Sequence, residues 1–431
     1  MHKPIYYIKE ILKIAFPIIL GNLGFILIGI GDVIVAGRHS TDTFAAISIA
    51  AAFVNCIMTI AIGLTASISP LLSNYKGEGK QIKRYFYPSI KFALFWALVS
   101  CIIIIAFIPI IPYMGFEDKL IKPIQQYMFI SALSTFGGGL HHSLKEFLQA
   151  FEIVLFPNLL TIFCVFLNLI LNIIFVFGWG IIPSMGVIGL AISSFIVRYF
   201  MGFALLLYCH KLMVLRNYSE KGYYKNLIKI GLPIAMAILI EFVAFNSIVI
   251  IMGKISGIYA AAQNLLCTLT TMTFMIPFAI SNAIAVKTGF ANGAKNMGDL
   301  KRYSYTGVSM SVIFMAICTI IYLSFPKFIV AIFTPDPELF KIVMSAIIIL
   351  GIYQIFDGLQ VSLSGICKGI KQTKIIMISN LIAYWGISIP LGCFLGLKLK
   401  MYLSGFWTGL LCSSIILCTI MIVKLKKYFI K

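Results

Sequence analysis

Charged residues are scarce in this sequence. Only 11% of its 431 residues are Asp, Glu, Lys or Arg, whereas 61% are hydrophobic, and a typical soluble domain is about a quarter charged. Such a chain cannot cover a folded domain with polar surface, which excludes a soluble globular protein. No long polar segment interrupts the hydrophobic stretches, so we expect a single membrane domain with nothing appended.

The sequence also lacks a phosphate-binding loop, because no Gly-Lys-Ser or Gly-Lys-Thr occurs in it. Gly21, Gly24, Gly29 and Gly31 follow no predicted strand and instead favour close helix packing. No Ser-His-Asp, Cys-His or metal-ligand cluster falls on one predicted helix face, so we expect no enzyme activity and no bound cofactor. The ten cysteines mostly lie singly in apolar stretches, and we expect them to be small buried residues.

Acidic residues are few compared with basic ones, 14 against 34, which gives a net charge of +20 at pH 7. The Lys and Arg residues lie between hydrophobic stretches and form no single stripe with interleaved aromatic residues. We therefore expect their partners to be anionic lipid headgroups and expect no binding of nucleic acid.

Long hydrophobic stretches recur along the whole chain, near or above the roughly 20 residues that cross a bilayer. The first is too long for a signal peptide and no small-residue cleavage pattern follows it, so we expect it to remain as a membrane span. Twelve spans are predicted, at residues 11–37, 44–74, 86–112, 123–150, 156–179, 186–210, 226–252, 259–290, 304–333, 338–366, 375–397 and 402–423.

The basic residues indicate the orientation. A cytoplasmic N-terminus puts 24 Lys and Arg residues in inner segments and 8 in outer ones, while Lys91 and Arg198 lie inside spans and are expected to reach the interface or pair with neighbours. This asymmetry follows the positive-inside rule, and it predicts an even number of spans with both termini in the cytoplasm.

The two halves of the sequence repeat. Residues 14–18 match residues 230–234 at an offset of 216, which aligns Pro17 with Pro233, and further matches hold as the offset drifts to 220. We predict two six-helix lobes, residues 1–215 and 216–431. Because six spans is an even number, both copies enter the membrane from the same side, and transporters built this way hold substrate between the halves near mid-membrane.

Three acidic residues lie deep in predicted spans: Asp32, Glu241 and Asp357. An ionised carboxylate there costs at least about 2.5–3.5 kcal/mol, so each needs a partner, a proton, an ion or a water-filled cavity. Asn168 and Asn172 are four residues apart and share a helix face, where their amide oxygens are suited to share a sodium ion with Asp32 or to bond its proton. The alternative is structural hydrogen bonding between helices.

The second half carries two acidic residues whose aligned positions in the first half are not acidic. Glu241 and Asp357 align with Phe25 and Gly138, and Tyr353 shares a helix face with Asp357. This asymmetry predicts a separate ion or substrate site in the second half, the alternative being a carboxyl pair that shares one structural proton. Pro17 and Pro233, which precede Asp32 and Glu241, are predicted to bend their helices.

Several segments together carry a family resemblance. They are residues 12–17 with 31–37, Asn74-Tyr75-Lys76-Gly77-Glu78-Gly79-Lys80, Gly365-Ile366-Cys367-Lys368-Gly369-Ile370-Lys371-Gln372-Thr373, and Gly405-Phe406-Trp407-Thr408-Gly409-Leu410. At this spacing the chain resembles the multidrug and toxic compound extrusion (MATE) family over nearly its whole length. The fold that this implies is all-α, with twelve transmembrane helices in two pseudo-symmetric six-helix bundles arranged as a V.

The resemblance also implies roles for single residues. Asp32 matches the aspartate of the first helix on which proton or sodium coupling depends, with Asn168 and Asn172 as the polar pair of helix 5. The second-half set (Glu241, Tyr353 and Asp357) resembles the NorM branch, where this half binds the coupling cation, and this favours Na+ over H+. The sequence departs from the family at Ile192, where a hydroxyl is common, which implies a first-half site that lacks a sodium ligand or prefers protons.

The resulting prediction is a monomeric antiporter in a bacterial inner membrane that exports organic cations and drugs in exchange for Na+ or H+ by alternating access. Sodium binding is expected at Glu241 and Asp357 or at Asp32. One alternative is a lipid-linked saccharide flippase of the same superfamily, which should have more spans and a cationic cavity. The other is a channel or membrane scaffold.

Overall fold

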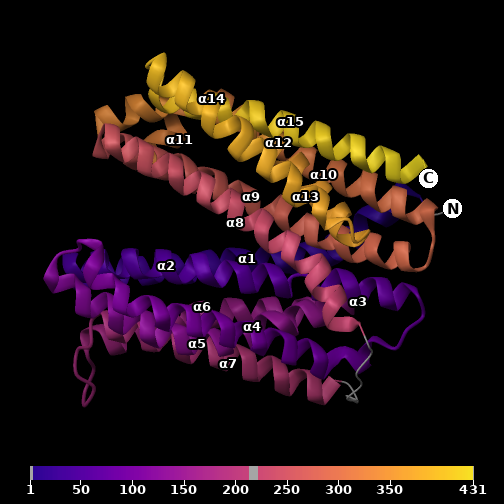
Figure 1. Cartoon of the computed structure of the whole chain (residues 1–431), viewed down its shortest axis with the longest axis horizontal. Helices are drawn as coiled ribbons and strands as arrows, with labels where there is room; N and C mark the ends of the chain where they lie inside the picture. The colour runs from indigo at the N-terminus through magenta and orange to yellow at the C-terminus, as the bar shows by residue number, and fades with distance from the viewer. Residues whose placement is uncertain (1–2, 213–221, 431) are drawn as a thin grey trace. The chain divides into compact units, whose positions relative to one another are not determined.

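The protein is described by a computed structural model over residues 3–212 and 222–430, and these residues are almost entirely helical (Figure 1). The prediction of an all-α membrane protein is confirmed. The predicted boundary between the lobes, at residues 215 and 216, lies outside the described residues.

Six of the predicted spans precede that boundary, and each coincides with a helix or a run of helices. Two spans are runs: α2 is followed by the short α3, and α4 is flanked by the 3-10 turns η1 and η2. The bounds are α1 Pro4–His39, α2 Thr41–Thr65, α3 Ile68–Gly77, η1 Ile82–Tyr85, α4 Phe86–Phe107, η2 Ile108–Met114, α5 Asp118–Ala150, α6 Leu155–Phe177 and α7 Val187–Leu212.

The other six spans are also occupied by helices. The eleventh is a mixed run in which two π-helical segments, η3 and η4, alternate with α-helix. The bounds are α8 Tyr223–Ile255, α9 Gly257–Gly293, α10 Met297–Ser324, α11 Pro326–Phe333, α12 Pro337–Gly369, α13 Thr373–Asn380, η3 Leu381–Ser388, α14 Ile389–Cys393, η4 Phe394–Lys398 and α15 Tyr402–Ile430.

The ninth span differs from its prediction. Residues 304–333 were expected to form one helix, but α10 ends at Ser324 and α11 begins at Pro326. Proline has no backbone N–H and disfavours helical conformation in the residue before it, so the hydrophobic stretch breaks there. By contrast, α1 and α8 continue through Pro17 and Pro233.

Eleven helices or runs in the described part of the chain are long and apolar enough to cross a membrane. The remaining long helix, α5, has 33 residues but carries polar side chains along its length, and it packs among α2, α4 and α7. Counting α5 gives the twelve spans that the sequence predicts.

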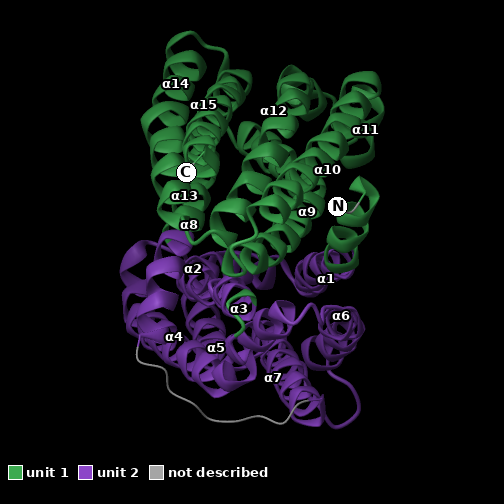
Figure 2. Cartoon of the chain, turned by 90° about the vertical axis from the view of Figure 1, so that its right-hand side faces the viewer, with its two compact units in different colours: residues 1–15, 77–79, 236–431 green, residues 16–76, 80–235 purple. Residues whose placement is uncertain are grey.

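The chain forms two compact units (Figure 2). Unit 1 contains residues 1–15, 77–79 and 236–431, and unit 2 contains residues 16–76 and 80–235. Both α1 and α8 therefore contribute to two units, with the change at Phe16 in one helix and at Met236 in the other. The described units differ from the predicted lobes in these shared helices.

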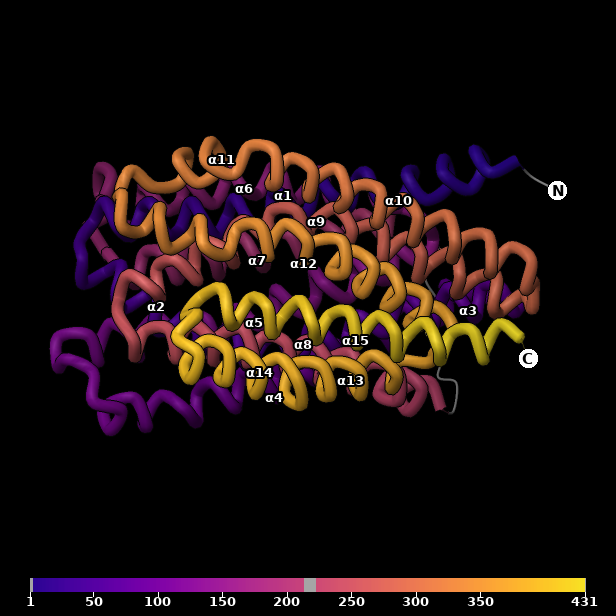
Figure 3. Tube along the Cα trace, turned by 90° about the horizontal axis from the view of Figure 1, so that it is seen from above, coloured from indigo at the N-terminus to yellow at the C-terminus, as the bar shows by residue number. Residues whose placement is uncertain are grey.

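Unit 1 is organised around α12, which packs against α9, α10 and α15. The run from α13 to η4 lies along α15, as the trace in Figure 3 shows. The first turns of α1 also belong to this unit. Glu10 forms an ion pair with Lys287 (Oε2 to Nζ, 2.5 Å), and the Tyr7 hydroxyl donates to Asp299 Oδ1 at 2.7 Å and accepts from Arg302 Nη1 at 3.1 Å.

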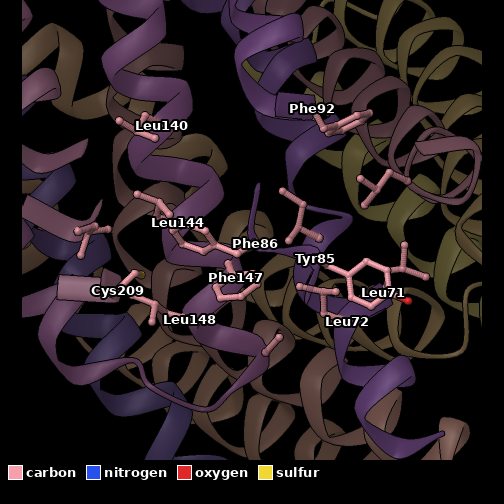
Figure 4. Close-up of a cluster of buried hydrophobic side chains, with 14 of the residues drawn as sticks. Leu71, Leu72, Tyr85, Phe86, Phe92, Leu140, Leu144, Phe147, Leu148 and Cys209 are labelled. Carbon is pink, nitrogen blue, oxygen red and sulfur yellow. The ribbon is translucent and has the colours of Figure 1, made fainter. Parts of the chain in front are cut away.

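Unit 2 has two apolar cores, one of which is shown in Figure 4. Phe86 and Phe147 meet edge to face there, with ring centroids 5.2 Å apart, beside the fully buried Leu72. Close helix contact also shapes this unit. A methyl group on Gly231 of α8 would come within 2.6 Å of the Leu64 carbonyl oxygen of α2, so only glycine fits at this crossing.

Candidate functional site

The first-half site lies within unit 2 and joins three helices. Asn172 of α6 donates from Nδ2 to Asp32 Oδ1 of α1 at 2.6 Å, and to Asn168 Oδ1 at 3.1 Å. Spacing of four residues puts the two amides on one helix face, as the sequence predicts. The structure therefore brings Asp32, Asn168 and Asn172 together.

The two amides are buried, yet each keeps one atom, Asn168 Nδ2 and Asn172 Oδ1, with no hydrogen-bond partner in the described part of the chain. Buried polar atoms normally have a partner, so such atoms in one cluster point to a ligand or water. Of the two atoms, Asn172 Oδ1 is an acceptor that suits a proton on Asp32 or a hard cation such as Na+, whereas Asn168 Nδ2 is a hydrogen-bond donor and suits an acceptor such as water.

A hydroxyl reaches this site from α7. Ser194 Oγ donates to Asp32 Oδ2 at 3.5 Å, a long bond, whereas Ser193 bonds the backbone of its own helix. Ser194, two residues after Ile192, thus brings a hydroxyl to Asp32, while the prediction that this site lacks a sodium ligand or prefers protons stays a prediction.

Arg198 was not predicted as part of the site. It lies one turn beyond Ser194, donates from Nη1 to Ser134 Oγ at 2.8 Å and to Met58 Sδ at 3.4 Å, and is close enough to Asp32 to attract it electrostatically. The expectation that this residue pairs with neighbours is confirmed. Its position four residues after Ser194 is a signal that sequence reasoning had available.

The second-half site lies within unit 1. Glu241 of α8 and the α12 pair of Tyr353 and Asp357 line one cavity of about 390 Å³. The Tyr353 hydroxyl donates to Asp357 Oδ1 at 3.3 Å, while Asp357 Oδ2 is buried with no hydrogen-bond partner among residues 3–212 and 222–430. The structure thus brings the three predicted residues of this half together around one volume.

The rest of the cavity wall is aromatic and polar but uncharged. It includes Phe242, Phe245 and Phe274 with the amides of Asn246 and Asn264. A volume of this size is typical of small-molecule sites. Aromatic faces and carboxylates both attract cations, so the wall is suited to an organic cation or to a cation with its hydration shell.

Two residues of the eleventh span were missed. Tyr384 of η3 donates its hydroxyl to Glu241 Oε1 at 3.0 Å, and Asn380 donates from Nδ2 to Glu241 Oε2 at 3.5 Å. The sequence held a signal for them, because they are two polar residues four positions apart in an apolar stretch, as Asn168 and Asn172 are.

Comparison with known families decides the identity. The MatE family model matches residues 17–174 and 233–394. The chain belongs to the MATE family. The two matched segments begin 216 residues apart and end 220 residues apart, which is the offset of the internal repeat. MATE proteins are transporters, so this is a multi-pass membrane transporter and not an enzyme.

Curated relatives are similar over almost their whole length. The probable multidrug resistance protein NorM of Acinetobacter baylyi is 25% identical over 435 residues, covering 97% of this chain and 96% of that protein. The multidrug resistance protein NorM of Aliivibrio fischeri is 26% identical over 437 residues, covering 97% and 95%. This MATE transporter is NorM-like, as Glu241, Tyr353 and Asp357 of its second half predict.

Solved structures share the fold. The eukaryotic MATE transporter AtDTX14 superposes with a TM-score of 0.87 at 19% identity, covering 98% of this chain and 96% of that one. A Pyrococcus furiosus transporter of the MOP superfamily, described as having a binding pocket of reversed polarity that suggests a different function, also reaches 0.87 at 16% identity, with 98% and 95% covered. Proteins with this fold therefore can differ in function. The charge of the residues that line the cavity in this MATE transporter is then the feature that bears on its substrate.

Proposed function

We propose that this MATE transporter exports organic cations in exchange for Na+ or H+ by alternating access. The observation that carries the proposal is the cavity of unit 1, in which Glu241 and Asp357 are the charged residues and aromatic side chains form much of the remaining wall. Relatives of similar sequence are named multidrug resistance proteins. This supports drugs as part of the substrate range.

The sign of the charge on the residues that line the cavity distinguishes this proposal from the flippase alternative. A lipid-linked saccharide carries phosphate and needs cationic residues, whereas the lining residues found in the described part of the chain include two acids and no Lys or Arg. Burying carboxylates without a compensating positive charge is costly, so the cavity favours a positively charged occupant.

Competition for the same carboxylates supplies the exchange. A cation that enters the site neutralises the charge that holds the substrate, so the two are not bound tightly at the same time. One charge that moves through 100 mV releases about 2.3 kcal/mol, enough to bias a step by nearly fifty-fold. The concentration gradient of the entering ion, together with the membrane potential when more positive charge enters than leaves, can then drive export without nucleotide hydrolysis.

We place the coupling ion preferentially in the second half and favour Na+, because Glu241, Tyr353 and Asp357 offer only oxygen donors, which hard cations prefer. Asp32, Asn168 and Asn172 provide a second candidate site, suited to a proton. The proposal further includes a monomer in a bacterial inner membrane, with both termini in the cytoplasm and basic loops against anionic lipid.

Efflux from intact cells tests this function. A fluorescent organic cation is loaded into cells that express the wild type, Glu241→Gln, Asp357→Asn or Asp32→Asn, with Na+ present, with Na+ absent and with a protonophore. Glu117→Gln serves as a control, because the Glu117 side chain is 70% exposed and pairs with Lys119. We expect Na+-dependent efflux that falls about tenfold or more in the Glu241 and Asp357 variants and is unchanged in the control.

The other outcomes are also informative. Efflux that is abolished by the protonophore and requires Asp32 alone would move the coupling site to the first half. No efflux of any organic cation by the wild type would contradict the proposal and favour the flippase. Ion current without an organic cation would indicate a channel.

A further inference from the structure

The eleventh span has an unusual backbone next to Glu241. Residues 381–388 form a π-helix, in which the Ile389 N–H bonds the Tyr384 carbonyl oxygen five residues earlier. π-helical turns are rare and occur frequently at functional sites. This segment begins directly after Asn380 and contains Tyr384. Both of these residues donate hydrogen bonds to Glu241.

The hydrogen bonds of Tyr384 have one consistent direction. Its hydroxyl accepts from Gln360 Nε2 at 3.3 Å and donates to Glu241 Oε1 at 3.0 Å. A phenol has a single proton to donate, and Gln360 Nε2 is itself a donor, so that proton points to the carboxylate. Gln360 is one turn beyond Asp357 on α12, and Tyr384 therefore links that helix to Glu241 on α8.

Asn380 holds the other carboxylate oxygen. Its Nδ2 donates to the Ala237 carbonyl oxygen at 3.2 Å and to Glu241 Oε2 at 3.5 Å. Since a carbonyl oxygen only accepts, it fixes the orientation of the amide. Both oxygens of Glu241 are thereby restrained by donors from a single helical run.

These donors are buried and are not among the residues that line the cavity. Tyr384 is 2% exposed and Asn380 3% exposed, whereas Glu241 lines the cavity. Glutamate has three rotatable side-chain bonds, so these hydrogen bonds restrain the carboxylate to a fixed place in the wall.

We infer that Tyr384 and Asn380 are positioning residues, which hold the carboxylate of Glu241 at the cavity wall ready to receive the coupling cation. The inference rests on the proposed function in taking Glu241 as a cation ligand. A preorganised ligand binds more tightly than one that must be ordered on binding. Loss of the Tyr384 hydroxyl lets the carboxylate leave its place in the wall, so Na+ binding should weaken about tenfold or more.

A purely structural role makes a different prediction. Tyr322 is a buried tyrosine of the same unit, and its hydroxyl donates only to a backbone carbonyl oxygen, that of Leu269, at 3.4 Å. If Tyr384 only joined helices, removal of either hydroxyl would lower stability and leave the affinity for the cation unchanged.

The test uses the purified full-length chain in detergent and follows the melting temperature. Na+ is titrated at constant pH and constant ionic strength with K+ as the replacing ion, and pH is titrated without Na+, for the wild type, Tyr384→Phe, Tyr322→Phe and Glu241→Gln. We expect Na+ to stabilise the wild type and Glu241→Gln to lose this effect. In Tyr384→Phe the Na+ midpoint should rise about tenfold or more, whereas Tyr322→Phe should keep the wild-type midpoint.

If the coupling ion is H+, the midpoint of the pH titration should rise by about one unit in Tyr384→Phe alone, because a donor to the ionised carboxylate favours the unprotonated form and its loss favours protonation. Equal midpoints in the two tyrosine variants would overturn the inference. So would a wild type whose response to Na+ and to pH does not depend on Glu241. Transport of an organic cation in liposomes is a separate readout: binding that needs Tyr384 together with absent transport would leave the inference intact and contradict the proposed function.

Discussion

At the scale of single residues, Asp32 in the first half and Glu241 in the second each accept hydrogen bonds from neutral side chains. Asp32 accepts hydrogen bonds from Asn172 and Ser194. Glu241 accepts them from Tyr384 and Asn380. Neutral donors stabilise a carboxylate without cancelling its charge, so the group keeps its attraction for a cation. This arrangement differs from an ion pair such as Glu10 with Lys287, in which the charge is already compensated.

The short bond from Asn172 to Asp32 is expected to contribute to stability. Asn172→Ala should lower the free energy of unfolding by about 1–2 kcal/mol, because Asp32 keeps only the long bond from Ser194. Thr161→Val on the same helix removes a bond to the helix's own backbone and should cost less. Melting temperatures of the two purified variants measure the difference, and equal losses would contradict a special role for the Asn172 bond.

Sequence reasoning identified the residues that share a helix but not their partners on other helices. The pairs Asn168 with Asn172 and Tyr353 with Asp357 follow from a spacing of four residues, which one helix fixes. The approach of Ser194 to Asp32, or of Tyr384 to Glu241, depends on how neighbouring helices rotate about their axes. When a helix is apolar on all sides, its hydrophobic pattern does not show which side faces a neighbouring helix.

At the scale of helices, the spans were predictable because hydropathy determines where a chain crosses a membrane. The places where a span departs from regular α-helix were not predictable from hydropathy. The break before Pro326 lies within a continuous apolar stretch, and the π-helix of residues 381–388 has the same composition as an α-helical span. In both regions a proline removes a backbone donor, Pro326 at the start of α11 and Pro390 just after η3.

The crossing of α2 and α8 depends on glycine. Gly231→Leu is expected to separate the helices and destabilise the protein by about 1–3 kcal/mol, because even a methyl group would meet the Leu64 carbonyl oxygen. Gly29→Leu is the matched control, since no atom lies within 4 Å of its added Cβ. A melting temperature for Gly29→Leu as low as that for Gly231→Leu would show that the crossing is not what glycine protects.

At the scale of the whole molecule, the unequal distribution of basic residues predicts the orientation. Tyr113 and Ile181, 90% and 100% exposed, lie in segments predicted to be outside, and the exposed Lys295 lies in a segment predicted to be inside. A membrane-impermeant maleimide should label Tyr113→Cys and Ile181→Cys in intact cells, and Lys295→Cys only after permeabilisation. The ten native cysteines are buried or half-buried, so the unmodified protein provides the background. Labelling of Lys295→Cys in intact cells would reverse the predicted orientation.

The ion pair of Glu10 with Lys287 also has a consequence for biosynthesis. The two residues are 277 positions apart in the chain. A ribosome that adds 5–20 residues per second makes Lys287 about 14–55 s after Glu10. Throughout that interval the first helix carries an acid whose native cation has not yet been made, and Tyr7 waits still longer for Asp299 and Arg302. The first turns of the helix that is synthesised first are therefore among the last segments to acquire their native contacts.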